Sequence, residues 1–332
     1  MRILRHYSGI PSEARGAVVA LGNFDGVHLG HRAVIGRARA IAGREGAPLG
    51  VLTFEPHPVQ VLRPESAPHR LTPFRVKARR LAEIDVDVLF ALHFDTAFSR
   101  KSAEDFVDEV LVRELGIRHA VVGHDFHFGC ERRGNPAFPA ERAALHGFDV
   151  TIVEPVGNAG EVYSSTRVRS YLKRGEPRLA AAILGHLWEV EGRVQHGDAR
   201  GRTLGYPTAN LSFADYVAPA FGIYAVWAGI VDGDDTTWYP AVASVGVRPT
   251  FGGGEPLLEV HLFDVDMGLY DAHLRVAFVA WIRPEMKFDD VDALKAEMAR
   301  DCETARAILE GSVPPPEPSD RPAPAAARRA NP

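Results

Sequence analysis

Short apolar runs alternate with amphipathic stretches through residues 16–156 of this chain. Each apolar run is bounded by turn residues, as buried strands are, and the stretches between them repeat their apolar residues at helical spacing. A chain that returns through a helix after every strand builds a parallel sheet with helices on both faces. The predicted strands are 16–24, 49–54, 86–94, 119–126 and 148–156, and the predicted helices are 31–43, 75–84, 103–115 and 137–147.

The pattern changes after Leu187. The segments that follow are β-rich and have no helical crossovers, which favours a small antiparallel barrel. An amphipathic run at 290–309 predicts a helix that closes it. The chain length also favours two domains, and the change in pattern places them at 1–184 and 185–312. The predicted strands of the second domain lie within 188–197, 222–233, 239–247, 257–266 and 273–282.

Composition narrows the possible functions. The net charge of −5 and the pI of about 6.3 leave no basic surface for nucleic acid, so we do not expect a nucleic-acid partner. No apolar run is long enough to cross a membrane, and the first residues lack the apolar core of a signal peptide. Two cysteines, Cys130 and Cys302, argue against a disulfide framework and fit a reducing compartment. We therefore expect a cytoplasmic protein.

The last residues, 313–332, are rich in Pro and Ala and offer little apolar surface to bury. Such a composition predicts a disordered tail. A short motif that binds a partner is the alternative.

The first strand is followed by the sequence GNFDGVHLGH at 22–31. Ligands of parallel sheets bind beyond the carboxyl ends of the strands, which is where this sequence lies. Gly26 and Gly30 allow close approach of a ligand, and a helix that starts at about His31 favours an anion at its N-terminus. His28 and His31 add hydrogen-bond donors, so nucleotide phosphates suit the site. A metal site is one alternative, although no carboxylate or Cys spacing completes it, and ordinary turn residues are the other.

The sequence SSTRVR at 164–169 opens a second helix-like run. Ser164 or Ser165 can cap that helix, and Thr166, Arg167 and Arg169 can then meet the same phosphates. Helix capping with a solvated basic face is the alternative.

Two further strands end in residues that can contact a ligand. Asp125 can bind a hydroxyl or amine, and Phe126 or Phe128 can stack on a ring; a turn Asp and core aromatic residues are the alternative. His57 lies between two prolines in a rigid turn, which can be a binding site or turn geometry alone.

The second domain opens on a Gly-rich basic stretch at 192–211, which is a plausible phosphate cradle although it is no Walker motif. The hydroxyl of Thr208 and the amide of Asn210 are two residues apart, so both face one way in an extended segment. Their oxygens suit Mg²⁺ with bound ATP phosphates; a simple Gly-rich hairpin is the alternative. Glu259 shares one strand face with Leu257 and His261, and is either an outward charge or a site residue.

These motifs, in this order and spacing, resemble the bacterial bifunctional riboflavin kinase/FMN adenylyltransferase family, also called FAD synthetases, over about 15–310. The HxGH pair alone is common to nucleotidylyltransferases, but the ordered set is specific. The resemblance implies a Rossmann-like nucleotidylyltransferase domain and a six-stranded antiparallel β-barrel kinase domain with a closing helix. It implies that riboflavin and ATP give FMN, and that FMN and ATP give FAD and pyrophosphate. Mg²⁺ would accompany ATP, and self-association is possible.

The resemblance also assigns residues in the first domain. His28 and His31 match the phosphate-binding pair, within a loop that includes Gly22, Asn23 and Phe24. The FMN phosphate attacks the α-phosphorus of ATP directly, so catalysis consists of alignment and charge neutralisation. The second phosphate-contacting motif is Ser165, Thr166 and Arg167, and the lining positions are His57, Asp125 and Phe126.

In the second domain, Thr208 and Asn210 match the ligands of Mg²⁺ and ATP, and Glu259 matches the general base. A base is needed because a ribityl hydroxyl is a poor nucleophile until its proton is removed. The remaining positions near nucleotide and flavin are Gly201, Arg202, Gly205, Pro207, Ser244, Arg248 and Phe251.

The chain departs from the family pattern at two places. Tyr163 precedes the SST motif where a smaller or aliphatic residue is usual, and Asp271-Ala272 replace a Gly and a basic residue. If that Gly has a positive φ, Asp is a tolerable substitute. Two rival functions remain: the first domain could transfer a nucleotidyl group to another acceptor, or one module could be an inactive flavin-binding regulator.

Overall fold

The computed structural model describes residues 1–67, 69–130, 133–135, 137–158, 160–196, 205–213, 216–233, 235–247, 256–265 and 268–316. The chain forms two compact units, which are described separately. The first comprises Met1–Arg167, Ile183–Gly185 and Asp215–Val217, and the second comprises the remaining segments from Val168 onwards.

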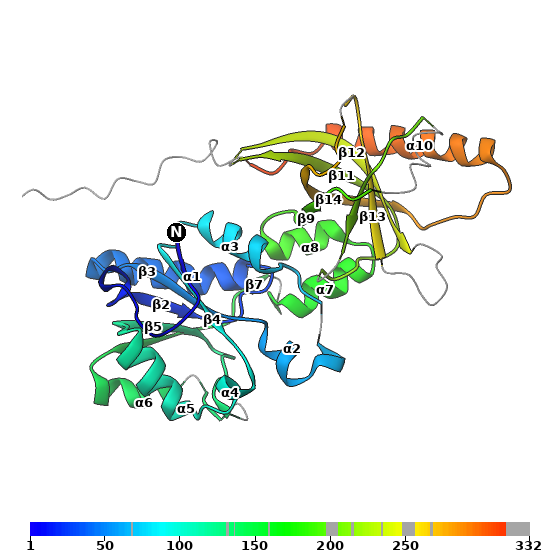
Figure 1. Ribbon diagram of the computed structural model, residues 1–332. Helices are drawn as coiled ribbons and strands as arrows, with labels where there is room; N and C mark the ends of the chain where they lie inside the picture. The colour runs from blue at the N-terminus through cyan, green and yellow to red at the C-terminus, as the bar shows by residue number, and fades with distance from the viewer. Residues whose placement is uncertain are drawn as a thin grey trace, which may run out of the picture. The chain divides into compact units, whose positions relative to one another are not determined.

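The first unit is built on a six-stranded parallel sheet in the order β1-β4-β3-β2-β5-β6 (Figure 1). All five predicted strands are present. The sixth, β1, is a three-residue edge strand beside β4 that the sequence did not predict. The strands are β1 (Arg2–Leu4), β2 (Val18–Leu21), β3 (Leu49–Glu55), β4 (Val88–His93), β5 (His119–Gly123) and β6 (Asp149–Val153).

Helices cover both faces of this sheet because alternate strand residues are apolar on both sides. Val18 and Ala20 face the layer of α1 and α3, whereas Val19 and Leu21 face the layer of α5, η3 and α6. The segment predicted as a helix at 103–115 is a short α-helix that continues as a π-helix. The helices are α1 (Leu29–Glu45), α2 (Pro58–Leu62), α3 (Phe74–Ala82), α4 (Thr96–Ser99), α5 (Ala103–Asp105), η3 (Phe106–Glu114) and α6 (Ala137–His146), with the 3-10 turns η1 (Ser12–Ala14) and η2 (Pro64–Ser66).

Strand β2 lies at the point where the strand order reverses, with β3 on one side and β5 on the other. The crevice beyond the carboxyl end of such a strand is the usual ligand site of an open α/β sheet. The chain leaves β2 at Leu21, so residues 22–28 lie in that position. A small hairpin, β7 (Gly157–Asn158) and β8 (Glu161–Val162), precedes α7 (Ser165–Lys173).

The second unit contains a six-stranded antiparallel sheet in the order β10-β13-β12-β11-β14-β9. Its edge strands meet through a bridge in which the Gln195 backbone N–H donates to the Asn210 carbonyl at 2.8 Å, so the sheet curls into the predicted barrel. The strands are β9 (Trp188–Arg193), β10 (Ala209–Ser212), β11 (Gly222–Asp232), β12 (Asp235–Val247), β13 (Pro256–Leu262) and β14 (His273–Arg283).

The closing helix is α10 (Val291–Glu310), in agreement with the prediction. Its apolar face packs Ala305 and Leu309 against Phe263, Ala225 and Val279 of the sheet. Asp290 caps it by accepting a hydrogen bond from the Ala293 N–H at 2.7 Å. Helix α8 (Pro177–Leu184) follows α7.

Among the described residues, no helix is long and apolar enough to span a membrane. Most of the tail predicted to be disordered, residues 317–332, lies outside the described residues.

Candidate active sites

The loop after β2 is fixed in place by a buried carboxylate. Asp25 is 4% exposed, and its side chain accepts hydrogen bonds from the backbone N–H groups of Leu71 and Thr72 and from the Thr72 hydroxyl, at 3.0–3.2 Å. The Gly26 N–H donates back to the same hydroxyl at 2.8 Å. The GNFDG sequence is therefore tied to a segment more than forty residues away.

The loop also holds an uncommon backbone conformation. Phe24 and Val27 have φ values of 50° and 43°, a left-handed region that costs non-glycine residues free energy. Two further hydrogen bonds hold it there: Thr53 Oγ1 donates to the Asn23 carbonyl at 3.1 Å, and Ser165 Oγ donates to the Asp25 carbonyl at 2.8 Å. Surrounding contacts thus over-determine the shape of the loop.

His28 is the N-cap of α1, which begins at Leu29, two residues before the predicted start. Its Nδ1 accepts a hydrogen bond from the His31 backbone N–H at 3.3 Å, so the neutral ring carries its hydrogen on Nε2. The two imidazole rings stack with centroids 3.6 Å apart. Gly30 leaves room for this stack, because a Cβ there would lie 3.1 Å from the His28 ring.

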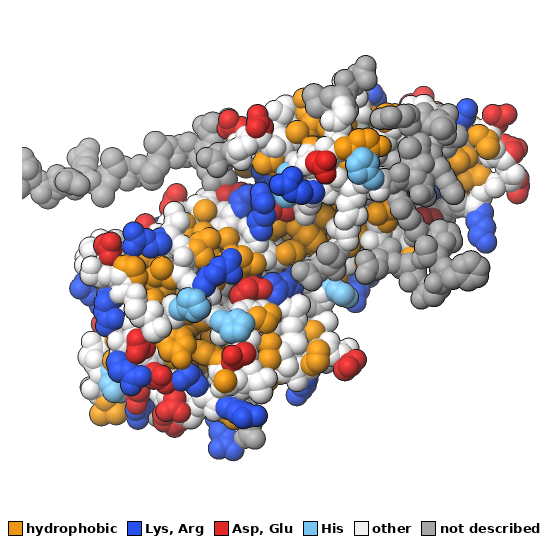
Figure 2. Space-filling model, in the orientation of Figure 1, with side chains coloured by type: hydrophobic (Ala, Val, Ile, Leu, Met, Phe, Trp, Pro, Cys, Tyr) orange, Lys and Arg blue, Asp and Glu red, His pale blue; other side chains and the backbone are white. Residues whose placement is uncertain are grey.

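Both histidines are neutral at pH 7. Burial lowers the pKa of His28 to about 4, although Asp25 and Asp125 oppose the shift. Burial also lowers the pKa of His31 well below its usual value, and the neighbouring His28 and Lys77 add to that effect. The Nδ1 atom of His31 is buried and has no hydrogen-bond partner among the described residues. Figure 2 shows histidine side chains beside acidic and hydrophobic ones on the surface of the first unit.

The SST sequence lies at the same loop. Ser164 Oγ accepts from the Arg167 N–H at 3.3 Å and so caps α7, while Ser165 reaches the Asp25 carbonyl. Thr166 is exposed in the first turn. The Arg167 guanidinium forms an ion pair with Glu161 of β8 and donates to the Val162 carbonyl. The SST and GNFDG sequences, about 140 residues apart, are therefore joined by a hydrogen bond at the loop after β2.

Asp125 also reaches this region, because its charge acts on His28. Phe126 does not project freely: it stacks on Phe128 with centroids 5.5 Å apart and packs against the aromatic core, the alternative that the sequence left open. His57 caps α2 in a reciprocal capping box with Gln60, so its turn geometry has a structural role. The structure thus brings Asp125 to the His pair and accounts for Phe126 and His57 by packing and capping.

In the second unit a polar row crosses the sheet. Asn210 of β10 pairs with Glu259 of β13, and Glu259 pairs in turn with Ser244 of β12. The same row continues through Ile223 of β11 to Arg283 of β14. Directly opposed residues project from the same face of a sheet, so these side chains share one face. Their neighbours Leu258 and Val260 point into the opposite, buried face.

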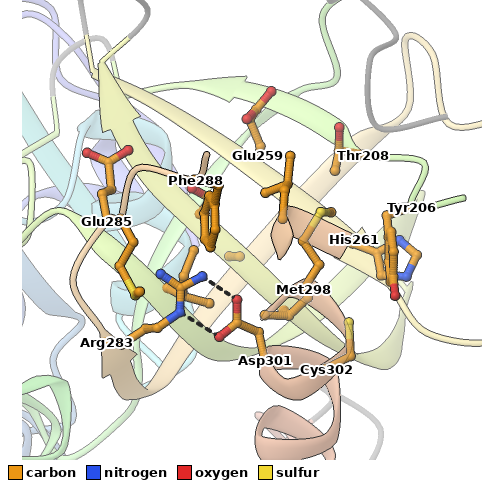
Figure 3. A pocket seen from close by; sticks show the side chains of 16 residues that line it. Tyr206, Thr208, Glu259, His261, Arg283, Glu285, Phe288, Met298, Asp301 and Cys302 are labelled. Atoms are coloured by element: carbon orange, nitrogen blue, oxygen red, sulfur yellow. Dashed lines mark hydrogen bonds and ion pairs between the residues drawn. The ribbon is translucent and has the colours of Figure 1, made fainter. Parts of the chain in front are cut away.

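Four residues of this row, Ile223, Ser244, Glu259 and Arg283, line a cavity of about 260 Å³ between the sheet and α10 (Figure 3). Glu259 and Thr208 lie near one another at one end of it. Its other walls are largely apolar, so the cavity suits a flat apolar ring with a polar end toward Glu259. The apolar lining residues are Ile223, Val242, Ala243, Met286, Phe288, Leu294 and Met298.

Two residues that line the cavity, Arg283 and Asp301, form an ion pair that the sequence did not predict. The Arg283 guanidinium donates to both carboxylate oxygens of Asp301 at 2.8 and 2.6 Å, and Glu297 lies 3.4 Å away (Figure 3). Asp301 is 5% exposed on α10. In the sequence, this ion pair is indicated only by an acidic residue, Asp301, on the apolar face of an amphipathic helix. Its role becomes clear once the fold places Arg283 beside it.

Of the remaining predicted positions, some lie among the described residues and some lie outside them. Gly205 has a φ of 88°, and the Pro207 carbonyl accepts a hydrogen bond from the His261 ring at 2.8 Å. Asp271 has a φ of 64°, so the position where the family has glycine does need a left-handed backbone. Gly201, Arg202, Arg248 and Phe251 lie outside the described residues.

The donors at the second site fit a metal that arrives with its ligand. Thr208 lines the cavity with Glu259, and Asn210 is the cross-strand partner of Glu259, so hydroxyl, amide and carboxylate oxygens meet at one place. Such hard oxygen donors suit Mg²⁺. No cluster of three or more His, Cys, Asp or Glu side chains able to hold a metal occurs in the described part of the chain. ATP phosphates would therefore supply much of the coordination.

Comparison with known proteins gives consistent matches. A family model described as FAD synthetase matches residues 10–167, and one described as riboflavin kinase matches residues 184–309. A bifunctional riboflavin kinase/FMN adenylyltransferase of Escherichia coli K12 is 40% identical over 306 residues, 92% of this chain and 96% of the relative. One of Pseudomonas fluorescens is 41% identical over 314 residues, 94% of this chain and 99% of the relative.

A solved structure matches over a similar length. It is titled a macrolide-efflux protein from Streptococcus pneumoniae, and its TM-score is 0.80 with 32% identity, covering 92% of this chain and 98% of that one. Both units are therefore found together in a known structure.

Proposed function

The chain belongs to the family of bifunctional riboflavin kinases/FMN adenylyltransferases and has both activities, and we propose which of its residues perform each reaction. Residues 1–184 form the adenylyltransferase domain and residues 185–312 the kinase domain. The observation that carries the proposal is the polar row of Asn210, Glu259 and Ser244 at the cavity, together with the separate His28–His31 pair.

In adenylyl transfer, an oxygen of the FMN phosphate attacks the α-phosphorus of ATP, and the bond from that phosphorus to the bridging oxygen breaks to release pyrophosphate. No protein nucleophile is required, so alignment and electrostatic stabilisation account for catalysis. Nε2–H of His28 and the ring of His31 donate to the phosphates, and the N-terminus of α1 adds its dipole.

The SST sequence meets the same phosphates from α7. Ser165 already bonds the Asp25 carbonyl, and Thr166 is exposed beside it. Arg167 exchanges its exposed partner Glu161 for phosphate oxygens, an exchange favoured because an exposed ion pair contributes little. Gly22, Asn23, Phe24 and Asp125 line this site.

In the kinase reaction, Glu259 removes the proton of the terminal ribityl hydroxyl as that oxygen attacks the γ-phosphorus of ATP and ADP leaves. Thr208 and Asn210 would hold Mg²⁺, which would supply charge neutralisation for the transferred phosphoryl group. The apolar cavity beneath α10 takes the flavin ring, with the ribityl chain directed to Glu259. Gly205, Pro207 and Ser244 border the nucleotide.

The experiment that tests the assignment starts from purified protein with riboflavin, ATP and Mg²⁺, followed by chromatography of the flavins. FMN should appear first and FAD should follow. With FMN as the flavin, FAD should form together with pyrophosphate. Production of FMN without any FAD would contradict the assignment of the first domain, and pyrophosphate release with another acceptor would identify the rival transferase. A cytoplasmic location and self-association remain predictions of the sequence.

A further inference from the structure

Lys77 of α3 is a buried cation close to the His28–His31 pair. It is only 2% exposed, and Thr53, itself fully buried, accepts a hydrogen bond from Nζ at a long 3.4 Å. An ammonium has three N–H donors. This is the one hydrogen bond of Lys77 within the described residues. Local hydrogen bonding therefore does not explain why a lysine is buried here.

The charges around Lys77 balance. Burial lowers the pKa of Lys77; Asp25 and Glu55 oppose that shift by attracting its ammonium, and Arg70 repels it. Lys77 in turn acts on His31. Both carboxylates have other partners: Asp25 accepts from Leu71 and Thr72, and Glu55 binds Arg70 at 2.5 Å. Lys77 therefore serves as the balancing charge for this group rather than as the partner of a single carboxylate.

A chain of hydrogen bonds connects Lys77 to the phosphate loop. Lys77 donates to Thr53 Oγ1, and Thr53 donates to the Asn23 carbonyl at 3.1 Å. The hydroxyl of Thr53 uses its one hydrogen on Asn23, so it receives the bond from Lys77. The ammonium thus lies behind the loop that carries Asn23, Phe24 and Asp25.

We propose that Lys77 is a positioning residue for adenylyl transfer: its buried ammonium supplies positive charge behind the His28–His31 pair and fixes the loop that meets the ATP phosphates. The inference rests on the proposed role of those two histidines. Because both are neutral, they bring no charge to the site. Arg70 is offset by Glu55.

Loss of the ammonium leaves a net negative charge behind the phosphate site. Two carboxylates, Asp25 and Glu55, then face a single cation, Arg70. A negative charge in a site of low dielectric repels the incoming triphosphate and weakens the loop that holds it.

The test is Lys77→Met, which keeps the length of the side chain and removes its charge. The rate of FAD formation from FMN and ATP, as kcat/KM for ATP, should fall about 10²-fold, the usual cost of a displaced catalytic constellation. FMN formation from riboflavin should not change, which shows that the second unit is folded; the histidine ring signals followed by NMR report on the fold of the first unit. Burial is the main cause of the low pKa of His31, and Lys77 adds to it, so the His31 pKa, followed by NMR of the ring nitrogens, should rise when the Lys77 charge is removed.

Arg79→Met is the matched control. Arg79 lies on the same helix, and its guanidinium pairs with Glu83, so its removal changes the net charge equally but leaves FAD formation and the His31 titration as in the wild type. If Lys77→Met does not fold, Lys77→Gln replaces it with the same expected result. FAD formation within twofold of the wild type, or an unmoved His31 pKa, overturns the proposal. Failure of the wild type itself to form FAD would instead contradict the function of the domain.

Discussion

Asn210 and Glu259 lie directly opposite one another on β10 and β13. Opposed residues of an antiparallel pair have Cβ atoms about 5 Å apart on the same face of the sheet. The carboxylate proposed as the base and the amide proposed as a metal ligand are therefore adjacent because of strand register, and neither depends on a loop for its position.

Glu259→Gln should remove the base and keep the size and polarity of the side chain. We expect kcat for FMN formation to fall by about 10²–10⁴-fold, the usual contribution of general base catalysis. Formation of FAD from supplied FMN and ATP should be unchanged. Chromatography of the flavins under both conditions measures this, with Glu303→Gln on the exposed side of α10 as the control. Loss of both activities in a folded Glu259→Gln variant would contradict separate sites.

His28→Asn should have the reverse effect. Asn is a good N-cap, so α1 keeps its cap while the imidazole donor is lost. FAD formation should fall at least about 10²-fold, as when one preorganised donor is removed, and FMN formation should continue. Full FAD synthesis by this variant would show that His28 acts only as a cap.

The stability of the first unit should depend on His28 in acid. Burial depresses the pKa of the folded state to about 4, below the unfolded value of 6.5. Between these values the unfolded chain binds more protons, so the stability present above pH 6.5 is lost as the pH falls towards 4. The free energy of unfolding should drop by about 2 kcal/mol from this group between pH 7 and pH 5.

Urea unfolding of wild type and His28→Asn at the two pH values isolates this contribution. The drop should be smaller in the variant by about the stated amount. An equal drop in both proteins would rule out His28 as its source.

Arg283→Met should destabilise the second unit and weaken riboflavin binding. It leaves the carboxylate of Asp301 buried without its bidentate partner, which costs about 3 kcal/mol. Because Asp301 and Met298 of α10 line the cavity, KM for riboflavin should also rise. Thermal unfolding and kinase kinetics measure the two effects. Arg300→Met, whose ion pair with Glu297 is exposed, should cost no more than about 1 kcal/mol; equal effects would contradict the assignment.

Asp271 can be tested through its backbone. Its φ of 64° suits glycine, is tolerated by Asp and is unfavourable for a β-branched residue. Asp271→Val should therefore be less stable than Asp271→Gly by about 1–2 kcal/mol. Thermal unfolding of the two variants gives the difference. Equal stability would mean that the turn changes conformation to accommodate valine.

Periodicity was sufficient for most of the fold. Strands buried on both faces gave continuous apolar runs, which identified β2 to β5, and the apolar residues of the partly exposed edge strand β6 were enough to identify it too. β1 was missed because three residues at a sheet edge carry no period, with two of them exposed. The π-helical turns of η3 were missed because the apolar spacing over 103–115 fits an α-helix as well.

The sites could be predicted only where short sequence motifs mark them. The sequence pointed to His28, His31, Glu259 and Asn210, but not to the residues that hold them. Lys77 lies on the apolar face of the amphipathic helix α3. From the sequence alone, however, a lysine in such a helix is expected to be a solvated charge. Its burial, like the pairing of Arg283 with Asp301, follows from tertiary contacts between segments distant in sequence, which no local pattern encodes.

The loop from Gly22 to His28 has a consequence for the thermodynamics of ATP binding. Its left-handed residues are held by hydrogen bonds to Thr72, Thr53 and Ser165, all of which are groups of the protein itself. The conformational entropy of ordering this segment is therefore lost during folding rather than on binding. Association of the triphosphate with the first unit then carries little entropic penalty from the protein backbone, and its affinity reflects chiefly the exchange of phosphate hydration for fixed donors.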